Sequence, residues 1–200
     1  MKLFIGIDLG RHGGIAAIDE TGTLIEYGMM PYKMDNFDIK QFNIMFRAMK
    51  IEHQLLAVCE QIHAMPNQSS VATLTFGKTI GEQLAMLKLL DVPYIEVSPT
   101  EWKKNVLKGM PWKADTVRFK APKGASKEEI DQLKKQHKKE HGSSNNRIKK
   151  EAKMVSAKFA MRMFPEANIM NGKNPHDGIA DAICMAYYGY LLDKGSLISK

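Results

Sequence analysis

KLFIGIDLG, residues 2–10, is an apolar run that ends in an acid and a glycine. Its composition is typical of a buried β-strand. Asp8 stands at the end of the run, where burial of an unpaired carboxylate would cost several kcal/mol, so this side chain needs a cation or another partner. Taken alone, Asp8 is equally consistent with a residue that opens a hairpin turn before Gly10.

A second apolar run, LLAVCE at residues 55–60, also ends in an acid. It predicts another strand with Glu60 at its carboxyl end, the edge at which sheets flanked by helices usually bind ligands. A lone glutamate at a strand end more often faces water. Because the pattern repeats that of Asp8, we interpret the two acids as parts of one site.

A pair of acids marks the final helix. NPHDGIADA, residues 174–182, predicts the start of a helix with Asp177 and Asp181 on one face, one turn apart. Two carboxylates that close repel each other unless a cation neutralises them. Asp177 is also a candidate N-cap residue, a role compatible with metal binding. Together with Asp8 and Glu60, this pair predicts a divalent-metal site.

The composition describes an ordinary globular chain. Two hundred residues with 44% hydrophobic content suit one compact domain. The apolar stretches are too short for a membrane-spanning helix, and the start shows no signal-peptide pattern, so we expect no membrane partner and a cytoplasmic, intracellular location. Cys59 and Cys184 are too few for a zinc site, and we expect buried thiols without chemistry.

Positive charge is concentrated in one segment. The net charge is +7, and residues 103–153 contain 16 Lys and Arg against 6 Asp and Glu. We expect a single domain over residues 1–200 that carries a basic, exposed and mobile insertion at about residues 109–145. Such a segment favours binding to phosphate backbones, although a solvated basic loop is the plain alternative.

The order of expected elements indicates the fold class. Three hairpin-linked strands are followed by a helix, and then by two strands that alternate with helices. This is the order of an α/β ribonuclease H-like fold, with a five-stranded mixed sheet of three antiparallel and two parallel strands flanked by helices. The expected strands are 2–8, 14–19, 23–30, 55–60 and 92–97, and the expected helices are 35–50, 69–90, one from 98, 127–141, 146–164 and 177–192.

Four motifs carry a resemblance to a known family: IGIDLG (5–10), VCEQ (58–61), VSPTEWKK (97–104) and HDGIADA (176–182). In this order and spacing the chain resembles the RuvC-like Holliday junction resolvases, particularly the phage and prophage type. The resemblance covers nearly the whole chain apart from the basic segment. IGIDLG also occurs in sugar kinases and actin-like ATPases, but these need a second similar domain, for which 200 residues leave no room.

The resemblance implies a site and a reaction. Asp8, Glu60, Asp177 and Asp181 would be the catalytic and metal-binding residues, and would hold two Mg²⁺ ions about 4 Å apart, with Mn²⁺ as an alternative. Hydrolysis of a phosphodiester would leave 5′-phosphate and 3′-hydroxyl ends. Family members are homodimers that nick opposing strands of a four-way DNA junction, whose twofold symmetry matches the dimer. A phage or bacterial host cell is the implied setting.

Two positions depart from the family pattern. In many bacterial relatives the last two ligands are three residues apart, whereas here they are four apart, and Gly178 stands three before Asp181. We favour Asp177 as the ligand because a carboxylate is the harder donor, and keep His176 as a candidate ligand or general base. The relatives place an aromatic residue where this chain has His63, so junction selectivity is expected to be looser.

Lysines near the motifs are the candidate nucleic-acid contacts. The resemblance places Lys150 where relatives carry a lysine close to the scissile phosphate. The other candidate contacts are Lys103, Lys104, Lys149, Lys153 and His63. A solvated surface lysine is the default for each of the others. A non-catalytic DNA-binding protein would not need four acids. A nuclease of the same fold that acts on RNA or an RNA–DNA hybrid is the alternative function.

Overall fold

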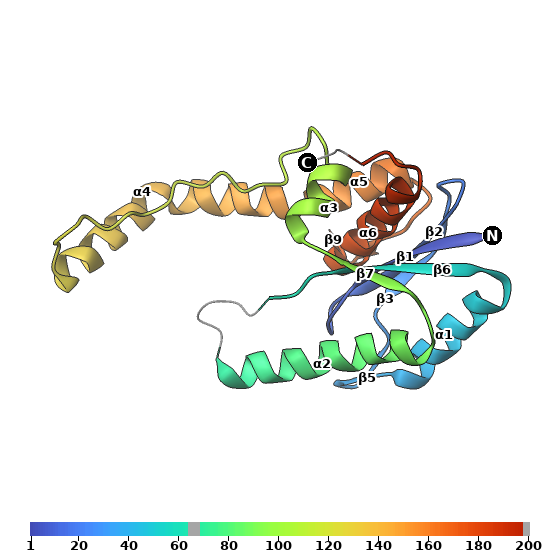
Figure 1. Cartoon of the computed structure of the whole chain (residues 1–200). Coiled ribbons are helices and arrows are strands. Elements are labelled where there is room, and N and C mark those ends of the chain that lie inside the picture. Colours follow the sequence, from blue (N-terminus) through green and yellow to red (C-terminus); the bar gives the residue numbers. More distant parts are fainter. Residues whose placement is uncertain (64–68, 198–200) are drawn as a thin grey trace. The chain divides into compact units, whose positions relative to one another are not determined.

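The computed structural model describes residues 1–63 and 69–197, and its largest sheet has five strands in the order β3-β2-β1-β6-β7 (Figure 1). The first three strands run antiparallel, and β6 and β7 run parallel to β1. This is the predicted mixed sheet with the first strand at its centre. The strands are β1 Lys2–Asp8, β2 Gly14–Asp19, β3 Leu24–Met29, β6 Gln54–Glu60 and β7 Tyr94–Val97.

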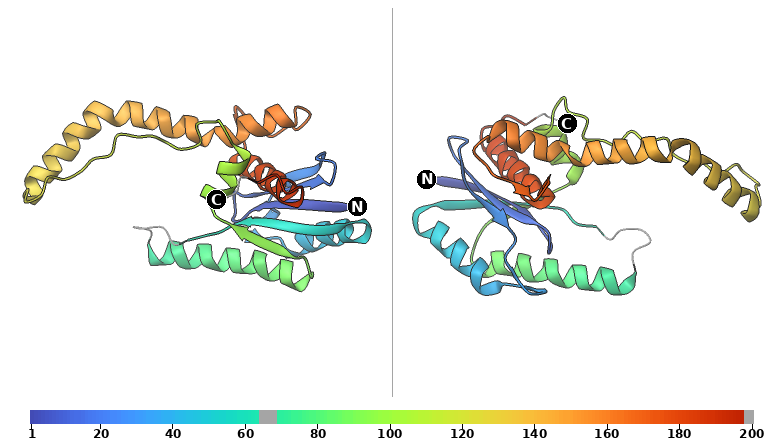
Figure 2. Two further views of the ribbon diagram at one scale, coloured as in Figure 1. Left: turned by 45° about the horizontal axis from the view of Figure 1, so that its top comes forward. Right: turned by 180° about the vertical axis from the view of Figure 1, so that it is seen from behind.

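Helices cover both faces of this sheet (Figure 2). On one face, α1 (Ile39–Glu52) and α2 (Ser70–Leu89) pack against alternate residues of β1, so that Ile5 lies in one cluster with Phe42 and Leu87. On the other face, α5 (Val155–Met163) and α6 (Asp177–Asp193) form a second cluster with β2. A short helix, α3 (Pro99–Val106), follows β7.

Gly6 lets α6 cross the central strand at backbone contact. A Cβ placed on Gly6 would lie 1.9 Å from the carbonyl oxygen of Ala182 and 2.4 Å from the amide nitrogen of Ala186. No side chain fits between the strand and the helix there. At the carboxyl end of β1, the backbones of Gly13 and Gly178 form a β-bridge. The amino terminus of α6 is therefore fixed at the edge of the sheet where β1 ends.

Two short hairpins precede helices, and the sequence analysis missed both. β4 (Tyr32–Lys33) pairs with β5 (Asn36–Phe37), and β8 (Met170–Asn171) pairs with β9 (Asn174–Pro175). The expected helix start at residue 35 is wrong, because the chain first forms the β4–β5 turn. Asp38 is the N-cap of α1, and its side chain accepts a hydrogen bond from the backbone amide of Gln41.

Residues 109–155 form a compact unit distinct from the one made by residues 1–108 and 156–200. The smaller unit contains the long helix α4 (Lys127–Lys153), which begins at a capping box between Ser126 and Glu129. None of the residues of α4 is buried, as expected for the basic insertion. The mobility of this segment stays a prediction.

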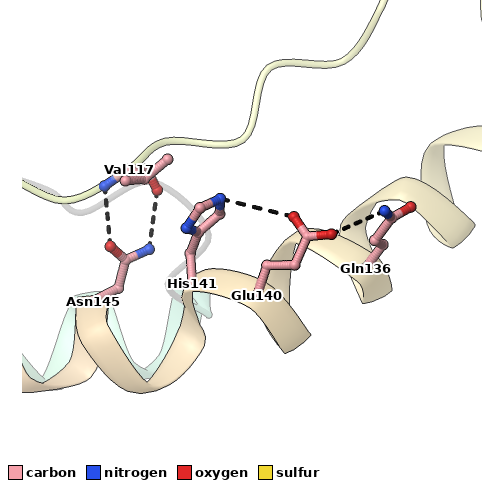
Figure 3. Close-up of polar contacts among 5 residues, drawn as sticks. All are labelled: Val117, Gln136, Glu140, His141 and Asn145. Carbon is pink, nitrogen blue, oxygen red and sulfur yellow. Dashed lines mark hydrogen bonds and ion pairs between the residues drawn. The ribbon is translucent and has the colours of Figure 1, made fainter.

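The expected break between residues 141 and 146 is wrong, because α4 continues through it. One glycine inside a helix costs only about 1 kcal/mol, so Gly142 does not end it. The side chain of Asn145 also makes two 3.0 Å hydrogen bonds with the main chain of Val117 (Figure 3). The helical run divides instead at Met154, where α4 ends and α5 follows.

The two cysteines are buried and free, as predicted. Burial raises the pKa of Cys59 to about 12 and that of Cys184 well above its ordinary value. Both thiols therefore stay protonated and are poor nucleophiles. None of the described helices combines the length and the apolar sequence needed to cross a membrane.

Candidate functional site

Asp8 and Glu60 are the last residues of adjacent parallel strands. Ile7 of β1 lies in register with Cys59 of β6, so the next residue of each strand lies at the same edge of the sheet. Both carboxylates are partly buried. The structure therefore brings together the two acids that the sequence places at strand ends.

Asp177 and Asp181 reach the same edge from α6, in which Asp177 is the first residue. The N-cap is His176, not Asp177: the imidazole Nδ1 of His176 accepts a hydrogen bond of 3.2 Å from the backbone amide of Ile179. This bond fixes the ring at the helix start and leaves Nε2 as the imidazole nitrogen available for other contacts.

Charge and burial act together on Asp8. Its pKa rises from 3.8 to about 8, first because burial removes the carboxylate from water, and then because of repulsion by Asp181, Glu60 and Asp177. The ammonium group of Lys103 acts in the opposite direction. All four predicted acids thus lie close enough to interact electrostatically, and one lysine lies among them.

Asp181 is held in a similar environment. Burial raises its pKa, while Lys103 and a hydrogen bond from the side chain of Ser156 act to lower it. Ser156 is itself buried, and its carbonyl oxygen accepts a 3.8 Å hydrogen bond from Cys184 Sγ. The hydroxyl of Ser156 thereby orients one carboxylate of the cluster from the start of α5.

Trp102 orients Glu60. The indole Nε1–H of this fully buried tryptophan donates a hydrogen bond of 2.9 Å to Glu60 Oε2. The helix that carries Trp102, α3, begins with Ser98 as N-cap and Pro99 in its first turn. Lys103 follows, with its Nζ 4.8 Å from the centre of the Trp102 ring. Lys104 is exposed on the same helix.

The donor set fits a hard divalent cation. Carboxylate oxygens are the ligands that Mg²⁺ and Mn²⁺ prefer, and a buried cluster of acids is stabilised when a cation neutralises it. Within residues 1–63 and 69–197, however, no three His, Cys, Asp or Glu side chains are already arranged as a metal-ligand group. The structure thus supplies the electrostatic environment and the donor chemistry, without a finished coordination shell.

The remaining sequence candidates lie elsewhere. His63 is exposed, three residues beyond the end of β6. Lys149, Lys150 and Lys153 are exposed on α4, which belongs to the other compact unit. Their roles as nucleic-acid contacts stay predictions.

Three residues at the site escaped the sequence analysis as functional positions. Trp102 lies in the motif VSPTEWKK, and an aromatic residue directly before two lysines could have indicated a functional position. Ser156 had no signal. Buried Gln83 of α2 accepts a 2.9 Å hydrogen bond from the backbone amide of Gly10 and donates one to the Tyr32 hydroxyl at 3.3 Å. It thereby holds the turn that follows Asp8.

Comparisons with known proteins give structural matches alone. No protein-family model and no curated protein match this chain. RuvC of T. thermophilus, solved in complex with a Holliday junction substrate, matches with a TM-score of 0.51 at 12% identity, over 98% of each chain. At this identity the likeness shows the fold, which is the ribonuclease H-like fold.

Two further structures match with TM-scores below 0.5. One is another RuvC structure from Thermus thermophilus, with a TM-score of 0.49 at 13% identity over 98% of each chain. The other is the yeast mitochondrial Holliday junction resolvase Ydc2, with a TM-score of 0.44 at 12% identity over 98% of this chain and 80% of that chain.

The raised pKa of Asp8 predicts a pH-dependent loss of stability without divalent metal. Because the folded-state pKa exceeds the unfolded one, folding takes up a proton between the two values, and the free energy of unfolding falls as pH rises from about 4 to about 8. Asp8→Asn removes this contribution. In EDTA, the variant should gain stability relative to the wild type by at most about 1.4 kcal/mol per pH unit over this range.

Denaturant unfolding at several pH values measures this difference, and addition of Mg²⁺ at pH 8 should stabilise the wild type more than Asp8→Asn. Parallel stability profiles for the two proteins would contradict the electrostatic account of Asp8.

Loss of the indole donor should weaken metal binding through Glu60. Trp102→Phe keeps a large apolar side chain but removes the N–H group, and partners that orient a metal ligand typically contribute 10- to 100-fold to affinity. We expect the Mg²⁺ concentration that gives half-maximal thermal stabilisation to rise roughly tenfold. Val106→Ala, which also leaves a cavity on α3, is the matched control and should keep the wild-type value. Equal Mg²⁺ dependence in both variants would show that Trp102 only fills space.

Proposed function

We propose that this ribonuclease H-like chain is a metal-dependent, structure-selective endonuclease that resolves four-way (Holliday) and related branched DNA junctions, a crossover junction endodeoxyribonuclease. The observation that carries the proposal is the convergence of four carboxylates from β1, β6 and α6 into one electrostatic cluster. Metal-dependent hydrolysis of a phosphodiester uses such a cluster to hold the cations, whereas DNA binding alone does not need one. The fold shared with RuvC supports the junction as substrate.

Each residue of the cluster has a distinct task in this proposal. Burial raises the pKa of both Asp8 and Asp181, and together with Glu60 and Asp177 these acids would hold two Mg²⁺ ions, or Mn²⁺. The chemistry that such ions would supply is activation of a water for attack on the phosphorus and stabilisation of the leaving 3′ oxygen. Hydrogen bonds from Trp102 and Ser156 keep two of these carboxylates, Glu60 and Asp181, oriented, which would reduce the reorganisation needed during the reaction.

Lys103 connects the acids with the substrate. It interacts electrostatically with both Asp8 and Asp181, and its Nζ lies over the Trp102 ring. A cation in this place offsets part of the negative charge before metal binds. It also attracts a phosphate to a site that would otherwise repel it.

The exposed face of α2 supports a homodimer. Val71 and Leu74 are each 75% exposed, although both are apolar. Gly77 and Gly81 lie further along the helix, and no described atom lies within 4 Å of a Cβ placed at either, so these glycines serve no close packing in the described part of one chain. Exposed apolar and small residues on one side of α2, with Lys78 among them, would let another helix approach closely. A second copy packed there would place two sites on one junction.

A cleavage assay on labelled synthetic substrates tests the proposed activity. The wild type should make paired, metal-dependent nicks near the crossover of a four-way junction in Mg²⁺ or Mn²⁺, and none in EDTA. Asp8→Asn and Asp181→Asn should lower cleavage by several orders of magnitude and keep junction binding, because they remove metal-binding charge and leave the basic surface intact. Linear duplex, flap and RNA–DNA hybrid are tested beside the junction as comparison substrates.

Cleavage of the hybrid with the junction left intact would move the function to an RNA-directed nuclease of the same fold. Full activity in both aspartate variants would refute the site assignment.

The dimer proposal predicts a mass in solution of twice the 22.5 kDa chain. Leu74→Glu places a charge on the exposed α2 face and should yield monomers by sedimentation. Ile44→Glu makes the same change at an exposed residue of α1 and should leave the dimer intact. A monomeric wild type, or equal dissociation in both variants, would contradict an interface on α2.

A further inference from the structure

All of the excess positive charge of the chain lies in the smaller unit. Residues 109–155 contain 13 Lys and Arg against 6 Asp and Glu, which equals the net +7 of the whole chain, and the other unit is balanced with 16 of each. The unit that contains the carboxylate cluster is therefore neutral overall, and attraction of a polyanion depends on the smaller unit.

Within α4 the charges are segregated by face. At about 100° per residue, eight of its nine basic residues fall within an arc of roughly 160°. The acids Glu129, Glu140 and Glu151 lie opposite, where Arg147 pairs with Glu151 at 4.0 Å. Glu128 and Asp131 are the acids within the arc, which therefore keeps a net charge of +6. The eight residues, here called the basic face, are Lys127, Lys134, Lys135, Lys138, Lys139, Lys149, Lys150 and Lys153.

Another side of α4 is already covered by residues of its own unit. Phe119 contacts the ring of His137 with centroids 5.6 Å apart, and His137 contacts His141 at 4.9 Å. Further along, Asn145, which lies just inside one edge of the basic arc, binds the main chain of Val117 (Figure 3). A helix that lies on a membrane needs a free apolar face. The side of α4 that carries His137 and His141 faces the segment that precedes the helix, so most of the basic face is left as the surface for a partner.

We propose that the basic face of α4 binds the phosphate backbone of a duplex arm of the DNA substrate. This inference rests on the proposed function, which supplies a branched DNA as substrate. A helix of 27 residues is about 40 Å long, the length of roughly 12 base pairs. Lysines on an exposed helix face contact phosphates as point charges and read no base edges. The face therefore binds duplex arms of any sequence and does not recognise the crossover.

A matched pair of triple variants tests this proposal. K134Q/K135Q/K138Q removes three charges from the basic face, and K40Q/K88Q/R147Q removes three from exposed positions outside it. Lysine, arginine and glutamine have similar helix propensities, so both variants should keep the helix content, checked by circular dichroism. Binding is measured by fluorescence anisotropy in EDTA, where DNA stays uncut, with a linear duplex and a four-way junction over a range of salt.

The basic-face variant should lower the slope of log affinity against log salt by roughly 2 to 3, and should weaken duplex and junction binding by the same factor. The control variant should bind both DNAs as the wild type does. Equal binding by the two variants overturns the proposal, and so does a loss confined to the junction. A loss of binding to phosphatidylserine vesicles with DNA binding unchanged would assign the face to membranes instead. Junction cleavage by the wild type is scored separately, so that failure of the proposed function is distinguishable.

Discussion

The backbone contact between α6 and β1 is the constraint on which the candidate site depends. Gly6 has no side chain, so Ala182 and Ala186 of α6 lie directly against the central strand. With larger residues at these positions the helix would be displaced from the sheet, and Asp181 would move away from Asp8. The glycine contact between residues 13 and 178 fixes the same helix at its amino terminus. Close packing of small residues thus brings together acids that are distant in sequence.

Without a cation, the proximity of these acids is electrostatically unfavourable, and it bears on how charge is distributed over the molecule. Burial and mutual repulsion raise the pKa of Asp8, so that the site without a cation favours a protonated acid. Lys103 offsets only part of the negative charge. In the proposed function, the remaining attraction for a nucleic acid would come from the unit of residues 109–155, which carries the net positive charge. The acids and the excess positive charge lie in different units, so one protein can hold a cluster of acids and also attract a polyanion.

The sheet order and the proximity of the four acids could be predicted from the sequence, because both leave local signals, whereas the role of the acids stays a prediction. An apolar run that ends in an acid appears twice, and a spacing of four residues appears once in the last helix. The bond between Trp102 and Glu60, and the bond between Ser156 and Asp181, join residues far apart in the chain and have no periodic signature. The continuity of α4 through Gly142 also depends on a distant partner, because Asn145 binds Val117.

The helix cap explains how a spacing of four residues can serve the site. His176 binds the backbone of Ile179 through Nδ1, which satisfies an amide of the first turn and holds the ring at the helix start. Asp177 then begins the helix, one turn before Asp181 on the same face, and it contributes to the raised pKa values of both Asp8 and Asp181. The carboxylate of Asp177 repels the other acids unless a cation is present. The ring of His176 is instead stabilised by its hydrogen bond with the backbone of the same helix. His176 is therefore the residue that fixes the start of the helix, and the role of Asp177 as a metal ligand belongs to the proposed function.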